Sequence, residues 1–145
     1  MILFSAELEL DDKNKNIMSK LIIDAAKDKI FLMIILKDTN YNISYENSRI
    51  NYEKLTLLIS EFLNSKNTDL RNISEIYVNR GPGSFAGIRN SLSVTKAIHL
   101  VNKIDYFCFS FDDFNEESDV KYEHIPKLCE KLGVKKNLIN PIYMS

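Results

Sequence analysis

Three of the four glycines in the chain fall within one stretch of nine residues, which is the best candidate for a site with chemistry. The stretch reads Gly81-Pro82-Gly83-Ser84-Phe85-Ala86-Gly87-Ile88-Arg89. Glycines gathered in this way indicate a backbone that needs positive φ angles or the close approach of another group. Pro82 stiffens the turn, and Ser84 is well placed to cap a following helix. A turn between a strand and a helix presents outward-pointing amides, so the first chemistry to weigh is anion binding.

Two nucleotide-binding patterns resemble this turn only in part. A P-loop needs Lys followed by Ser or Thr after its last glycine, whereas Gly87 is followed by Ile and Arg. The dinucleotide pattern G-x-G-x-x-G/A is met in form by residues 81–86, but the acid it requires about 20 residues later would be Asp105, which precedes its predicted strand. The remaining interpretation is a purely structural tight turn.

Few other side chains suggest chemistry. Asp24 ends a predicted strand, where an acid could hold a nucleotide-bound metal. Ala25 and Ala26 follow it and offer no hydroxyl group to a phosphate, so a turn or capping role is the preferred interpretation. The two histidines, His99 and His124, lie far apart, and no metal site or cofactor is expected. We expect His99 to be packed or at an interface, and His124 to be exposed.

Composition and charge limit the classes of function. The 145 residues suffice for one domain, and a net charge of −1 gives no broad basic surface for nucleic acid. Cys108 and Cys129 do not form a C-x-x-C pair, so we expect two reduced, partly buried thiols. The longest apolar run, residues 30–36, is too short for a membrane span. The start of the chain lacks the basic residues of a signal peptide, so a cytoplasmic protein is expected.

The hydrophobic pattern predicts an α/β fold with a mixed five-stranded sheet. Strands are predicted over residues 20–24, 30–36, 41–45, 73–79 and 106–111, and helices over 51–64, 84–101 and 124–132. The strand over 30–36 is apolar throughout, which predicts a central position. The first three strands are predicted to form an antiparallel meander, and the helix-connected strands to be parallel. The order β-β-β-α-β-α-β, with a short helical tail, is typical of an actin-like ATPase or ribonuclease-H-like half-domain.

The two ends of the chain differ from residues 20–111. Residues 1–19 form an extension with two open interpretations: translation starts at Met18, or residues 2–10 form a short extra strand. Residues 112–145 begin with an acidic run and offer one helix, which Gly133 is expected to end.

Two predicted helices are apolar on more than one face, which favours packing on a sheet and also on a partner. The alternative is that the tail covers the second face. The predicted partner interface consists of Tyr52, Leu55, Leu58, Ile59, Phe62, Leu92, Thr95, Ile98 and His99. Arg89 has two open roles: a contact to phosphate or partner, or a surface arginine that anchors the turn.

The glycine stretch resembles the signature of the TsaB family, G-P-G-S-F-T-G-L-R, with Ala86 in place of Thr and Ile88 in place of Leu. Residues 21–24 are similar to the family's first strand, residues 51–55 to its His-Ser-Glu-x-Leu segment, and residues 141–144 weakly to its C-terminal Pro-x-Tyr-Leu. Family members carry a second lobe, so the resemblance implies that residues 112–145 are a reduced tail.

The resemblance implies a function as well as a fold. TsaB proteins are non-catalytic scaffolds that pair with TsaD, the enzyme that transfers threonylcarbamoyl to adenosine 37 of tRNA, in a complex that also uses the ATPase TsaE. We therefore expect a TsaD-like partner, an indirect link to a TsaE-like ATPase, and tRNA contact only through the complex. A homodimer stays open. The alternative function is a nucleotide-binding enzyme or residual ATPase that uses the Gly81–Gly87 turn.

Overall fold

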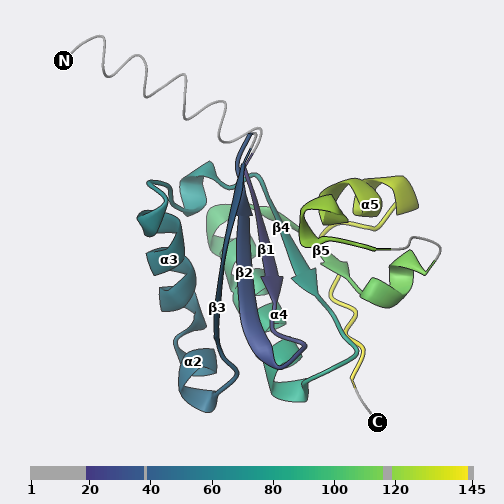
Figure 1. Cartoon of the computed structure of the whole chain (residues 1–145), viewed down its shortest axis with the longest axis horizontal. Coiled ribbons are helices and arrows are strands. Elements are labelled where there is room, and N and C mark those ends of the chain that lie inside the picture. The colour runs from purple at the N-terminus through teal and green to yellow at the C-terminus, as the bar shows by residue number, and fades with distance from the viewer. Residues whose placement is uncertain (1–18, 38, 116–118, 144–145) are drawn as a thin grey trace.

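The computed structural model describes residues 19–37, 39–115 and 119–143, and the two interpretations of residues 1–17 lie outside this part of the chain. A five-stranded sheet has the order β3-β2-β1-β4-β5 (Figure 1). The strands are β1 (Lys20–Asp24), β2 (Lys29–Ile35), β3 (Asn40–Glu46), β4 (Glu75–Asn79) and β5 (Asp105–Phe109). β1–β2 and β2–β3 pair antiparallel, whereas β1–β4 and β4–β5 pair parallel. The predicted mixed sheet, meander and parallel half are confirmed.

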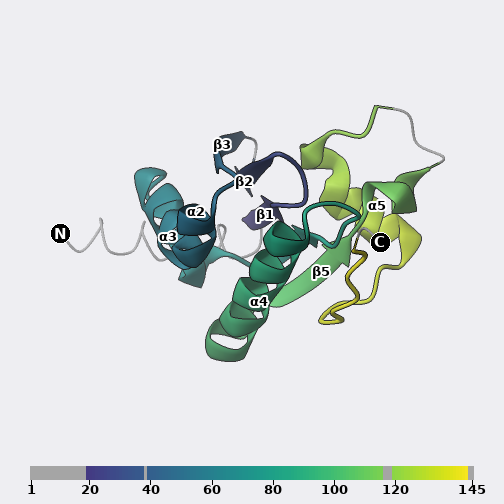
Figure 2. The ribbon, with the colours of Figure 1, turned by 90° about the horizontal axis from the view of Figure 1, so that it is seen from below.

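The helices divide between the two faces of the sheet. Helices α2 (Arg49–Glu53), α3 (Leu55–Ser65) and α4 (Phe85–Asn102) cover one face, and α5 (Ile125–Leu132) lies on the other (Figures 1 and 2). Each face has its own apolar cluster, because alternate residues of each strand point to opposite sides. In β1, Leu21 and Ile23 belong to the larger cluster under α2, α3 and α4, and Ile22 belongs to the smaller cluster under α5.

Three predicted features need correction. The helix predicted over 51–64 is two helices that meet at Lys54, and it begins earlier because the Ser48 hydroxyl accepts the Asn51 amide as an N-cap. The strand predicted to be central, β2, lies second from the edge, because β4 pairs with β1 and makes β1 the middle strand. The last strand ends at Phe109, because the Ser110 hydroxyl caps a short 3-10 helix, Phe111–Phe114.

The tail returns along the outer edge of β5. The Asn137 amide donates to the Tyr106 carbonyl at 2.7 Å, and the Asn137 side-chain oxygen accepts the Tyr106 amide at 2.9 Å. Lys136 forms an isolated antiparallel bridge with Phe107. The tail therefore covers an edge that would otherwise present unpaired backbone groups.

Candidate functional site

The glycine turn lies between the carboxyl end of β4 and the start of α4. Its Gly81–Pro82 peptide bond is cis, and the Ser84 hydroxyl accepts the Gly87 amide at 3.1 Å. The predicted capping role of Ser84 is therefore confirmed. Ser84 also contacts α2, because its hydroxyl lies 3.4 Å from that of Tyr52.

Two glycines of this turn pack against the β1–β2 hairpin. A Cβ atom built at Gly83 would overlap the carbonyl oxygen of Ala26, and one built at Gly87 would overlap that of Ala25. The Ser84 amide donates to the same Ala26 carbonyl at 2.8 Å. The glycines are thus required for close approach of two backbone segments. Carbonyl oxygens face the turn here, and their partial negative charge opposes the binding of a phosphate.

The third glycine, Gly81, contacts the tail instead. Its φ angle is +109°, and a Cβ atom there would overlap the carbonyl oxygen of Ile142. The Ile142 amide donates to the Arg80 carbonyl at 2.7 Å, and the ring centroids of Phe85 and Tyr143 are 4.7 Å apart. Part of the weakly similar C-terminal Pro-x-Tyr segment, residues 141–143, therefore lies against the glycine signature.

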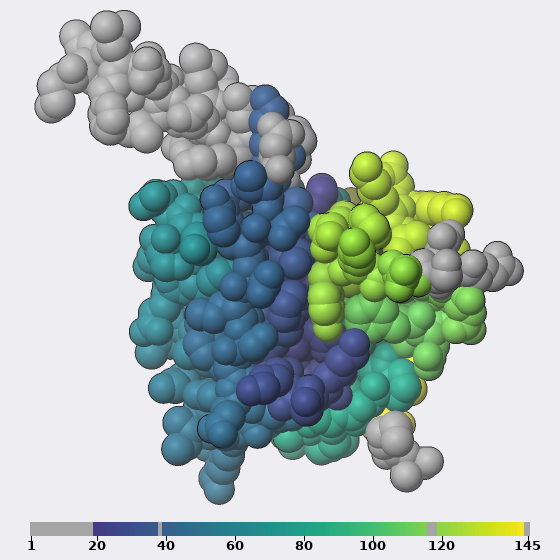
Figure 3. Space-filling view, in the orientation of Figure 1, coloured from purple at the N-terminus to yellow at the C-terminus, as the bar shows by residue number. Residues whose placement is uncertain are grey.

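Asp24 is 1% exposed at the end of β1. One carboxylate oxygen accepts the Ala26 amide at 3.0 Å, which is the predicted turn role, and the other accepts the Tyr122 hydroxyl at 2.5 Å. The Tyr122 ring also stacks on Phe31, with centroids 4.1 Å apart. Burial, and then the Asp24 charge, raise the pKa of Tyr122 above its ordinary value. In Figure 3 the yellow-green tail lies directly against the purple hairpin.

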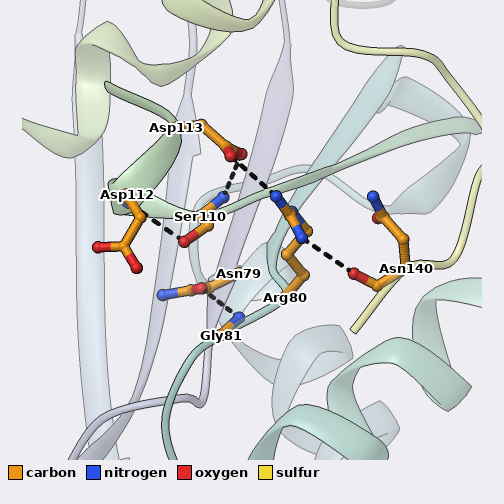
Figure 4. Close-up of polar contacts among 7 residues, drawn as sticks. All are labelled: Asn79, Arg80, Gly81, Ser110, Asp112, Asp113 and Asn140. Carbon is orange, nitrogen blue, oxygen red and sulfur yellow. Dashed lines mark hydrogen bonds and ion pairs between the residues drawn. The ribbon is translucent and has the colours of Figure 1, made fainter. Parts of the chain in front are cut away.

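A polar cluster lies beside the glycine turn (Figure 4). The Arg80 guanidinium donates to the Asp113 carboxylate at 2.8 Å and to the Asn140 carbonyl at 3.2 Å. The other Asp113 oxygen accepts the Ser110 amide at 2.9 Å, and the Asn79 side chain accepts the Gly81 amide at 2.8 Å. The cluster joins the ends of β4 and β5 to the tail.

Sequence reasoning missed the Arg80 cluster. The signal available was an arginine directly before the glycines and an acidic pair, Asp112 and Asp113, directly after the last strand. A cavity of about 400 Å³ adjoins the ion pair. It is lined by Arg80, Cys108, Asp113, Leu132, Val134, Lys135, Leu138 and Asn140.

The structure also places the histidines and thiols. His99 is half-buried, with its Nδ1 atom 2.9 Å from the Ile104 carbonyl oxygen and its ring edge-on to Tyr106. His124 is exposed, as expected. Both cysteines are buried. Burial raises the pKa of Cys108 to about 11 and that of Cys129 to about 12, so neither thiol is a reactive nucleophile at neutral pH.

The residues predicted as a partner interface need correction. All of them except His99 are buried. Most belong to the apolar cluster between the sheet and α2, α3 and α4: Tyr52, Leu55, Ile59, Phe62, Leu92 and Ile98. A side chain packed there cannot contact another protein while the helix stays on the sheet. The large apolar side chains that these helices expose are Ile50, Leu57, Phe85, Leu100 and Val101. The described tail packs on β5 and on the opposite face of the sheet. Its contact with the exposed side chains of these helices is that of Tyr143 with Phe85 at the start of α4.

Within residues 19–37, 39–115 and 119–143, no three His, Cys, Asp or Glu side chains gather in a way that could hold a metal ion. No helix in that part of the chain combines the length and the apolar composition that crossing a membrane requires.

Comparisons with known proteins agree on one family. The family model of TsaD, tRNA N6-adenosine threonylcarbamoyltransferase, matches residues 45–110, which contain the glycine turn. A protein of Buchnera aphidicola subsp. Baizongia pistaciae named tRNA threonylcarbamoyladenosine biosynthesis protein TsaB is 31% identical over 80 residues, or 55% of this chain and 36% of that protein. A protein of the same name from Buchnera aphidicola subsp. Schizaphis graminum is 27% identical over 90 residues, which are 62% of this chain and 43% of that protein.

Solved structures support the fold. YeaZ from Pseudomonas aeruginosa superposes with a TM-score of 0.60 at 17% identity, covering 64% of this chain and 44% of that one. The chain therefore spans less than half the length of the relatives it matches.

Proposed function

Because this chain belongs to the TsaD/YeaZ glycoprotease family, we propose that it is a non-catalytic scaffold subunit of the TsaB type. It binds a TsaD-like catalytic subunit in the cytoplasm and supports threonylcarbamoyladenosine modification of tRNA at position 37. A TsaE-like ATPase and the tRNA associate with it through the complex.

The observation that carries this proposal is the exposed apolar surface on the outer sides of the helices. At the end of α4, Leu100 and Val101 are adjacent, and Val101 is 78% exposed. Between α4 residues 86 and 97, the outward positions include the small residues Ala86, Ser93 and Ala97. Small side chains allow a partner helix to approach closely. When a partner covers exposed aliphatic side chains, their removal from water stabilises the complex.

The contacts of the glycine turn weigh against the alternative, a nucleotide-binding enzyme. Gly83 and Gly87 face the hairpin carbonyls rather than an open cradle, and the Ser84 amide already donates within the chain. Asp24 is buried and accepts two hydrogen bonds from the chain itself. Neither group is free to bind a phosphate or its metal in this conformation.

The test is binding to the TsaD-like protein of the same organism. We would measure the affinity of the purified wild-type chain, of Val101→Glu on α4, and of Leu132→Glu on α5 as the matched control. Leu132 is also an exposed aliphatic residue near a helix end, 50% exposed, but it lies on the opposite side of the sheet. We expect Val101→Glu to weaken the complex at least about tenfold, because it places a charge in an apolar interface.

Leu132→Glu is expected to bind as wild type does. Equal weakening by both substitutions would contradict the proposed location of the interface. A wild-type chain that fails to bind, together with measurable binding of ATP, would contradict the scaffold proposal and favour the nucleotide-binding alternative.

A further inference from the structure

The C-terminal end of the described chain is attached to the glycine turn by contacts of different kinds. The Ile142 amide donates to the Arg80 carbonyl, and the Arg80 guanidinium donates back to the Asn140 carbonyl. The Phe85 and Tyr143 rings pack together at 51°. These contacts join segments about 60 residues apart in the chain.

The conformation of Gly81 suits this attachment. Its φ angle of +109° is one that residues with a side chain rarely adopt, and the Ile142 carbonyl occupies the space that a side chain would fill. The Asn79 side chain holds the Gly81 amide at 2.8 Å. The backbone of the turn therefore leaves room for the Ile142 backbone to approach. Gly83 and Gly87, by contrast, serve the contact with the hairpin.

The same turn sets the start of α4. Phe85 is the first residue of the helix, and Ser84 is its N-cap, which holds the Gly87 amide through its hydroxyl and the Ile88 amide through its carbonyl. A displacement of the Phe85 ring or of the turn preceding it would move Ser84 relative to these two amides. The peptide segment and the first turn of the helix thus both contact residues 80–85.

We propose that Arg80–Phe85 is a peptide-binding surface, that its occupant is the Asn140–Tyr143 segment of the same chain, and that this occupancy fixes the first turn of α4. These contacts are all within one chain. Removal of the peptide segment loosens the start of α4 without unfolding the sheet.

Amide hydrogen exchange on the full chain tests the coupling. The variant is Tyr143→Ala, and the matched control is Ile139→Ala, a truncation of a tail side chain that is 38% exposed, against 41% for Tyr143. In Tyr143→Ala we expect the amides of Ile142, Gly87 and Ile88 all to exchange at least about fivefold faster. The reason is that loss of the Tyr143 ring lowers the free energy of local opening at these amides. The amides of β1 and β4 should keep their wild-type rates in both variants.

Faster exchange at Ile142 alone would overturn the coupling, because the segment would then be released without loosening α4. No change at any of the three amides, or equal changes in the Ile139→Ala control, would also overturn it.

Rescue in trans provides a second measurement. A synthetic peptide of residues 137–145 is added at millimolar concentration to the Tyr143→Ala variant, because a tethered segment has an effective concentration of about that size. We expect the wild-type peptide to slow exchange at Gly87 and Ile88, and a peptide with the Tyr143→Ala change to have no effect. If both peptides act alike, the glycine turn is not a surface for this segment.

Discussion

The Tyr122 hydroxyl donates a 2.5 Å hydrogen bond to the Asp24 carboxylate across 98 residues of sequence. Asp24 ends the middle strand of the sheet, and Tyr122 lies in the tail, so the bond fastens the tail to the carboxyl end of β1. Lys27 lies over both aromatic rings of the same contact, 4.2 Å from the Phe111 centroid and 5.6 Å from that of Tyr122. In this conformation the tail occupies the position at which an α/β sheet commonly receives a ligand.

Removal of this hydroxyl should destabilise the fold. Tyr122→Phe leaves a buried carboxylate oxygen without its donor, and hydrogen bonds to charged groups contribute about 1.5–3 kcal/mol. We expect the free energy of unfolding in urea to fall by about that amount. The control is Tyr143→Phe, a half-exposed tyrosine of the same tail, which should change stability by less than about 0.5 kcal/mol. Equal losses in the two variants would contradict the assigned role of Tyr122.

The pH dependence of the same pair has a definite sign. The pKa of Tyr122 is raised in the folded chain above its ordinary value of 10.0, first by burial and then by the Asp24 charge. Above pH 10 the unfolded chain loses this proton and the folded chain keeps it, so unfolding becomes more favourable. The stability difference between wild type and Tyr122→Phe should therefore shrink as the pH rises above about 10. A difference that stays constant or grows between pH 8 and pH 11 would contradict this linkage.

The strands could be predicted well because each carries a local signal. Residues 20–24 are a short apolar run beside polar turns, and the predicted and observed bounds of β1 agree. The break at Lys54 carries no such signal, because Lys54 is an ordinary helix-forming residue. In the structure its backbone leaves the helical region, with φ −111° and ψ 25°. The shortened last strand follows from Ser110, whose capping role depends on Asp113 three residues later.

For the candidate site, the sequence predicted the local turn and its cap but not the distant groups that the turn contacts. The glycine spacing predicted a turn and the Ser84 cap, both of which depend on neighbours in the sequence. The groups that the turn contacts, Ala26 and Ile142, lie far away in the chain, and only the topology brings them together. The predicted interface residues were misplaced for a related reason: an apolar pattern marks a helix face, but it does not say whether that face meets the sheet or a partner.

The glycine at position 83 should be essential for the fold, independent of any ligand. Gly83→Ala places a methyl group against the Ala26 carbonyl, which is backbone and cannot move aside easily, so we expect a loss of about 3 kcal/mol in unfolding free energy. Gly133→Ala is the control, because no described residue other than its chain neighbours comes within 4 Å of a Cβ there, and the unfavourable feature is the φ angle of +67°. It should cost about 1–2 kcal/mol. Calorimetry of both variants would decide, and a smaller loss for Gly83→Ala would show that the hairpin can shift.

Two leucines on α3 allow the core and the proposed partner surface to be tested separately. Leu55 is fully buried, whereas Leu57 is 53% exposed. Leu55→Ala should lower the free energy of unfolding by about 2–5 kcal/mol through the cavity it leaves. Leu57→Ala should leave stability within about 0.5 kcal/mol of wild type and weaken binding to a TsaD-like partner. Denaturant titration and a binding measurement on both variants would check this. A Leu57→Ala chain that binds normally would exclude that residue from the interface.

The ion pair between Arg80 and Asp113 should couple more strongly than an ion pair in solvent. Its side chains are only 17% and 27% exposed, and the Nη2–Oδ1 distance is 2.8 Å. A double-mutant cycle with Arg80→Ala and Asp113→Ala should give a coupling energy of about 1–3 kcal/mol, because both partners are held in place by further hydrogen bonds.

The matched cycle uses Arg49 and Glu53 on α2, an exposed pair at 3.0 Å, for which we expect a coupling energy of about 0.3–0.5 kcal/mol. Adding 1 M salt should abolish the coupling at the exposed pair and largely preserve that at Arg80. Equal coupling energies with equal salt sensitivity would mean that the cluster joining β4, β5 and the tail contributes no more than an ordinary surface contact.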